Sequence, residues 1–124
     1  SKQATDISVI EKISAAANTI DEMESLLFRN FDELLHDAQN NKQTPIERRA
    51  HFRYQASLVI EKSMSVVDSL FSVAGGRSVF TGSDIQQRFL DIHTARAHVA
   101  NNPSNFARNL GNLHLGHENQ DFFI

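Results

Sequence analysis

The sequence contains no cysteine, no tryptophan and only two prolines among its 124 residues. Without cysteine, neither a disulfide framework nor a thiolate-bound metal can form, and the composition suits a reducing compartment such as the cytoplasm. All five glycines lie beyond residue 74. Because glycine and proline most often interrupt helices, residues 1–74 can form long helices with a single break at Pro45.

Basic residues are not in excess either, since the formal net charge is -3. Nucleic-acid binding needs a positively charged face that neutralises phosphates, so we expect no nucleic-acid partner. The sequence also has no apolar run of roughly 18 residues, the length that a membrane-spanning helix requires. We therefore expect no membrane partner.

Apolar residues make up 40% of the chain, which is enough for the core of one domain over residues 1–124. No segment shows the strict alternation of a strand, so the predicted fold class is all-α, a helical bundle. In the first predicted helix, over residues 6–40, apolar side chains recur about every 3.5 residues, which is the repeat of left-handed helix packing. We expect this stripe to face neighbouring helices: Ile7, Ile10, Ile13, Ala17, Ile20, Met23, Leu27, Phe31, Leu34 and Ala38.

The second predicted helix covers residues 45–74. Thr44, Pro45 and Glu47 form a typical helix start, with a capping hydroxyl, a proline at the first position and a glutamate that completes the capping box. Arg53 interrupts the inward face of this helix. Two interpretations stay open. Either Arg53 snorkels to water or pairs with an acidic residue of the first helix, or it faces a ligand phosphate.

A third helix is predicted over residues 84–100 and a short fourth one over residues 103–111. The tail, residues 112–124, ends in three apolar residues. An apolar end of this kind docks on its own domain or on a neighbouring subunit, and we favour a subunit contact.

The residues alone give few signs of chemistry. Gly75 and Gly76 can close the second helix, and His98 by itself is typical of a structural histidine. His93 and His98 are five residues apart, which places them on different sides of a helix, so we expect no metal site there. No catalytic serine triad or phosphate-binding loop is evident.

Three segments together resemble a known family. They are Val-Asp-Ser-Leu-Phe over 67–71, Ala-Gly-Gly over 74–76, and the segment from Asp91 to His98. They resemble the C-terminal helical domain of flavin-dependent monooxygenases with the acyl-CoA dehydrogenase fold, the oxygenase components of two-component aromatic hydroxylases and their relatives. Leu90 departs from that family, which usually has a second arginine there. Arg77 and Ser78 follow the glycine pair where true dehydrogenases often have glycine and tyrosine, which favours the monooxygenases.

The resemblance implies a four-helix bundle of which this chain lacks the first helix, so that residues 1–124 are a fragment of a larger flavoenzyme. It also implies reduced FMN or FAD supplied by a separate flavin reductase, an aromatic or related small organic substrate, molecular oxygen, and a homo-oligomer that is a tetramer in the parent enzyme. His98, with His93 as a second candidate, is implied as the base near the substrate. The residues implied near the flavin are Gly75, Gly76, Ser78, Gln86 and Arg53.

Two other functions stay open at this stage. One is the C-terminal domain of an acyl-CoA dehydrogenase, and the other is a non-catalytic helical module for oligomerisation or protein binding. Because the first helix of the bundle is missing, we expect the 124-residue chain alone to be inactive and to self-associate through bare apolar surface.

Overall fold

The computed structural model describes residues 6–73, 84–97, 102–121 and 124, apart from the side chains of residues 73, 84–86 and 89. These residues form four helices and contain no strand, which confirms the all-α prediction. The helices are α2 (Ile7–Gln39), α3 (Ile46–Val73), α4 (Asp84–Ala97) and α5 (Pro103–His114). The predicted positions of all four are confirmed, although α5 continues three residues further than expected, and residues 98–100 of the third predicted helix lie outside the described residues.

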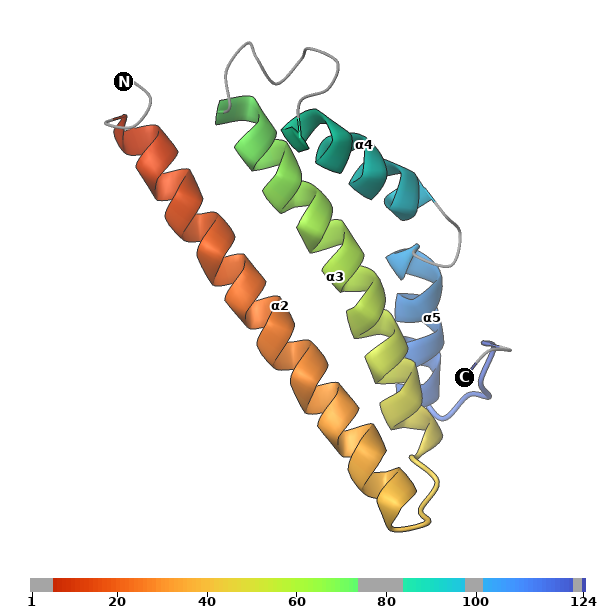
Figure 1. Ribbon diagram of the computed structural model, residues 1–124. Helices are drawn as coiled ribbons and strands as arrows, with labels where there is room; N and C mark the ends of the chain where they lie inside the picture. The colour runs from red at the N-terminus through yellow and green to blue at the C-terminus, as the bar shows by residue number, and fades with distance from the viewer. Residues whose placement is uncertain (1–5, 74–83, 98–101, 122–123) are drawn as a thin grey trace.

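Helix α3 is the centre of the arrangement. It contacts each of the other three helices. Figure 1 shows α2 and α3 side by side as a long antiparallel hairpin, with α4 and α5 following one another along the opposite side of α3. As a result, the end of α3 lies near α4, and the beginning of α3 lies near α5 and the C-terminus.

Local sequence explains where α2 begins and ends. The Asp6 side chain caps the helix, because its Oδ1 accepts from the backbone N–H groups of Ser8 (2.8 Å) and Val9 (3.4 Å). At the other end Asn41 has a positive φ of 56°. This left-handed residue lets Lys42 N–H donate to the Asp37 carbonyl at 2.8 Å, which ends the helix as in a Schellman motif.

The stripe of α2 that faces α3 differs from the predicted one. The buried residues of α2 are Ala16, Met23 and Asn30, seven residues apart. Most of the predicted stripe is exposed, so α3 covers only part of it, and the expectation that other helices cover the rest remains a prediction. The large apolar residues of α2 that are exposed are Ile7, Ile10, Ile13, Ile20, Phe28, Phe31 and Leu35.

A buried apolar cluster lies between α3 and α5. Ala50, Leu110 and Leu113 form a buried cluster, against which Ile124 also packs. The tail is held there by the buried Asn109, whose amide donates to Asn119 Oδ1 at 2.8 Å and whose Oδ1 accepts from Gln120 N–H at 2.6 Å. The described tail residues thus dock on their own domain, and the expected subunit contact remains a prediction.

Candidate functional site

Helices α3 and α4 are joined by charged side chains. His93 Nε2 lies 2.7 Å from Asp68 Oδ1. Since a carboxylate can only accept, Nε2 must be the nitrogen that donates. Further along the same contact, Arg96 Nη2 lies 3.8 Å from Glu61 Oε1. The Asp68–His93 pair is half-exposed, with 42% and 39% of the two side chains accessible.

Only some of the predicted site residues belong to the part of the chain that the structure describes. Gly75, Gly76, Ser78 and His98 are outside the described residues, and so is the side chain of Gln86, although its backbone belongs to α4. His93 is the predicted catalytic residue that the structure describes. It belongs to α4 and points to Asp68 of α3, a partner that the predicted roles did not include.

Arg53 is the other described site residue. Its guanidinium stacks over the Phe106 ring at 4.5 Å, and its Nε lies 4.0 Å from Asp121 Oδ2. The acidic partner therefore comes from the tail, and the interpretation that placed this partner on the first helix is wrong. Arg53 Nε is buried and forms no hydrogen bond to any described residue. A ligand phosphate would have to compete with Asp121 for this cation, so flavin binding by Arg53 remains a prediction.

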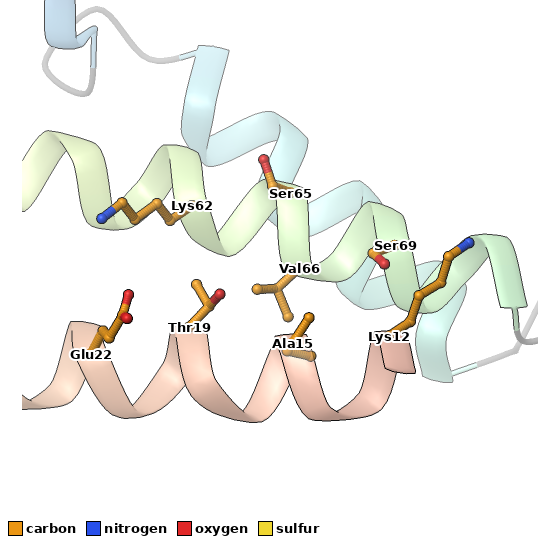
Figure 2. Close-up of a pocket in the computed structure, with 9 residues that line it drawn as sticks. Lys12, Ala15, Thr19, Glu22, Lys62, Ser65, Val66 and Ser69 are labelled. Carbon is orange, nitrogen blue, oxygen red and sulfur yellow. The ribbon is translucent and has the colours of Figure 1, made fainter. Parts of the chain in front are cut away.

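A groove of about 290 Å³ runs between α2 and α3. Figure 2 shows side chains of the two helices facing each other across it, with Lys12 at one end and Lys62 with Glu22 at the other. Lys12 Nζ donates to Ser72 Oγ at 3.4 Å, one residue before the end of α3. Two ammonium groups against one carboxylate make the groove more suited to an anion than to a cation.

A second cavity of about 380 Å³ opens on the other side of the α2–α3 contact, closer to the C-terminus. It is lined mainly by apolar side chains, among them Leu27, Phe31, Phe52 and Ile124. Arg49 and Arg53 also reach it. Phe31 is largely exposed, so this cavity adjoins the uncovered apolar face of α2.

Arg48, Glu33 and His51 form a third charged cluster, between α2 and α3. Arg48 Nε and Nη2 each donate to a Glu33 carboxylate oxygen at 2.9 Å, and this bidentate pair lowers the pKa of Glu33. Arg48 Nη1 lies 3.3 Å from His51 Nδ1. Partial burial lowers the pKa of His51, and the positive charges of Arg48 and Arg29 act in the same direction.

In the described part of the chain, no group of three or more histidine or acidic side chains could hold a metal ion. A membrane span needs both length and apolar character, and no helix in that part combines the two.

Sequence reasoning missed Asp68 and Asp121 as partners. Asp68 and His93 are 25 residues apart, and no spacing rule connects them. A signal existed only in the resemblance, because both residues belong to segments that resemble the family. For Asp121, 68 residues after Arg53, the sequence offered no signal.

Two solved structures of known proteins match the fold of this chain. The chain matches the HsaA monooxygenase from M. tuberculosis with a TM-score of 0.86 and 27% identity, covering 93% of this chain and 30% of that one. It also matches the 3-HSA hydroxylase from Rhodococcus sp. RHA1 with a TM-score of 0.90 over 97% of this chain and 32% of that one, and at 23% identity this likeness shows the fold. The chain thus spans about a third of these proteins.

A search of curated proteins found no match. The family model described as acyl-CoA dehydrogenase, C-terminal domain, matches residues 1–103, which is most of the chain. The same fold appears in both solved structures, and the segments that suggested the resemblance lie within the matched range. The chain belongs to the acyl-CoA dehydrogenase C-terminal domain family.

Proposed function

We propose that this chain is the C-terminal domain of a reduced-flavin-dependent monooxygenase that hydroxylates an aromatic or related small organic substrate with molecular oxygen. The main support is the likeness to the HsaA monooxygenase, at 27% identity over 93% of this chain. The departure from the dehydrogenase pattern at Arg77 and Ser78 supports the same choice.

In this proposal the segment that joins α3 to α4 approaches the cofactor. Gly75 and Gly76 let the backbone come close to a flavin, while Ser78 and Gln86 supply polar groups beside it. Reduced flavin, FMN or FAD delivered by a separate reductase, supplies the electrons that activate oxygen. Among the described residues, Lys12 lies beside Ser72 near the end of α3 and supplies a cation for a phosphate. Arg53 lies 19 residues earlier in α3 and would first have to leave Asp121.

His98 is proposed as the base that takes the proton from a phenolic substrate. It follows directly on Ala97, the last residue of α4. Imidazole titrates near neutral pH, so it can accept a proton and make the ring more electron-rich.

The uncovered apolar face of α2 supports the assembly part of the proposal. Its exposed isoleucines and phenylalanines need a cover in water, which the rest of the parent chain and other subunits of a homo-oligomer, proposed as a tetramer, would provide.

The family description favours one second candidate, the C-terminal domain of an acyl-CoA dehydrogenase. The full-length protein distinguishes the two. Reduced FMN or FAD, oxygen and a panel of phenols should give hydroxylated product if it is a monooxygenase. Reduction of an electron acceptor by acyl-CoA, with no hydroxylated phenol, would contradict the proposal.

Replacing His98 tests its role within that enzyme. In His98→Ala, flavin binding should be retained, while hydroxylation slows by roughly 100-fold or more and hydrogen peroxide release rises. Product formed per flavin oxidised is the measurement. A wild-type yield across pH 6 to 9 would remove His98 from the catalytic residues.

A further inference from the structure

The exposed side of α2 carries a regular apolar stripe. Its residues alternate three and four positions apart, which is the spacing that helices use to pack lengthwise against one another. We call these residues the outer stripe: Ile10, Ile13, Ala17, Ile20, Leu27, Phe31, Leu34 and Ala38. Its exposed large members, Ile10, Ile13, Ile20 and Phe31, are between 43% and 64% accessible. The residues of α2 that are buried belong to a different series, so α3 leaves much of the outer stripe uncovered.

The charges of α2 are divided between its two sides. The lysine and the arginine of this helix both reach α3, because Lys12 Nζ donates to Ser72 Oγ and Arg29 Nη2 donates to Gln55 Oε1, each at 3.4 Å. Four acidic side chains of α2 are exposed instead: Glu11, Asp21, Glu24 and Asp32. The positive charges of α2 thus face its neighbour within the domain, and these negative charges remain on the surface.

The exposed acidic residues adjoin the outer stripe. Glu24 lies within it, since it is four residues after Ile20 and three before Leu27. The other three each directly follow a residue of the stripe, which places them about 100° further round the helix: Glu11, Asp21 and Asp32. Buried residues directly precede stripe positions, so they lie on the opposite edge: Ala16, Met23 and Asn30. The outer stripe is therefore bordered by α3 on one edge and by carboxylates on the other.

The cavity of about 380 Å³ gives this surface a shape as well as a charge. Leu27, Phe31 and Leu34 of the outer stripe line it, together with Phe52 of α3 and Ile124. A helix that lies along the stripe can insert apolar side chains into such a recess, as in the knobs-into-holes packing of coiled coils.

We propose that the outer stripe binds one amphipathic helix whose own apolar stripe is edged by lysine or arginine, with a cationic side chain opposite Glu24. A polar residue within a heptad series fixes the register of the pair. Helix α2 of a second copy is the wrong partner, because two such faces would place carboxylates against carboxylates. This proposal extends the assembly role proposed for α2 and holds whichever flavin reaction the parent enzyme carries out.

The experiment uses two synthetic four-heptad peptides with the same apolar residues, one edged by lysine and the other by glutamate. Each carries a fluorescent dye, and anisotropy measures its Kd for the 124-residue chain at low and high salt. Three forms of the chain are compared: the wild type, Asp21→Lys with Glu24→Lys, and Glu47→Lys with Glu118→Lys. The last is the control, because it changes the net charge equally at exposed residues outside α2.

We expect the wild-type chain to bind the lysine-edged peptide at least about tenfold more tightly than the glutamate-edged one, with a smaller difference at high salt. Asp21→Lys with Glu24→Lys should reverse this preference, whereas the control should keep it. In the full-length protein, where the partner helix is present, Asp21→Lys with Glu24→Lys should lower the thermal midpoint more than the control does.

Equal affinity of the wild-type chain for both peptides would overturn the proposal, and so would a control variant that loses the preference. Equal thermal midpoints of the two full-length double variants would also contradict it. A chain that forms a dimer and does not bind the lysine-edged peptide would assign the outer stripe to a second copy. A full-length enzyme that makes no hydroxylated product would contradict the proposed function alone, since peptide binding does not depend on that reaction.

Discussion

Helix α3 makes two kinds of contact along its length. Towards α5 it buries Ala50 against Leu110 and Leu113, and the tail closes this cluster with Ile124. Towards α2 the contact includes several polar side chains. There Asn30 donates to Gln55 at 2.9 Å. Arg48 pairs with Glu33, and Ser63 Oγ lies 3.6 Å from Met23 Sδ.

The difference shows which helix surfaces are already buried within this domain and which are not. In α5 the most apolar positions are the ones buried against α3, so this contact needs no further partner. In α2 many of the large apolar side chains are exposed instead. Helix α2 is therefore held by its less apolar side and leaves its more apolar side for another part of the protein or for another subunit.

The largest expected effect is the loss of a side chain from the α3–α5 cluster. Leu110→Ala should lower the free energy of unfolding of the 124-residue chain by about 2–5 kcal/mol, because it leaves a cavity among packed residues. Met23→Ala, in the α2–α3 contact, should fall at or below the lower end of that range, since flexible and polar neighbours can adjust around it. Urea denaturation measures both.

Leu115→Ala is the control, because Leu115 is 75% exposed just after α5. It should change the free energy of unfolding by no more than about 0.5 kcal/mol. A larger loss in Met23→Ala than in Leu110→Ala would contradict the comparison between the two contacts.

The second prediction concerns the exposed face of α2. Ile13→Gln combined with Ile20→Gln should leave unfolding nearly unchanged but weaken self-association of the 124-residue chain, since each apolar Å² covered contributes about 25 cal/mol. Sedimentation velocity at micromolar concentration measures the change, and Ser14→Gln, a polar exposed position on the same helix, is the control. A wild-type chain that sediments as a compact monomer would show this prediction wrong.

Sequence reasoning found the helices because their signals are local. Pro45 precedes α3 and Pro103 begins α5, and each acts within one turn of its own position. The same reasoning did not show that α3 covers only part of the apolar stripe of α2. A hydrophobic period shows which side of a helix must be covered, but not which neighbour covers it.

The charged contacts of the candidate site could not be predicted from the sequence, for a related reason. Arg53 was correctly singled out as a cation on an inward face, yet its partners Phe106 and Asp121 become neighbours only when α5 and the tail fold back on α3. Asp68 and His93 likewise meet because α4 reverses direction after α3. Such pairs follow from the tertiary arrangement and leave no mark in local spacing.

The smallest expected effect is a pH dependence in the polar α2–α3 contact. The pKa of His51 is lowered from its ordinary value of 6.5, mainly by burial. The folded chain therefore binds a proton at His51 less readily than the unfolded chain, so stability falls as the pH drops below about 6.5. The lowered pKa of Glu33 acts in the same direction, but its stabilising effect is lost only as the pH falls below about 4.5.

Replacing His51 and Glu33 one at a time should separate their effects on stability, which occur in different pH ranges. Between pH 7.5 and pH 5.5 the urea midpoint of His51→Gln should fall less than that of the wild-type chain, because the variant has no imidazole at residue 51 to take up a proton on unfolding. Glu33→Gln should lower the midpoint at both pH values by a similar amount, since the carboxylate stays ionised across this range in both states. If the urea midpoint of His51→Gln falls as much as that of the wild type, or more, the pH dependence arises from another residue. In that case the α2–α3 contact would be no more sensitive to acid than the apolar α3–α5 cluster.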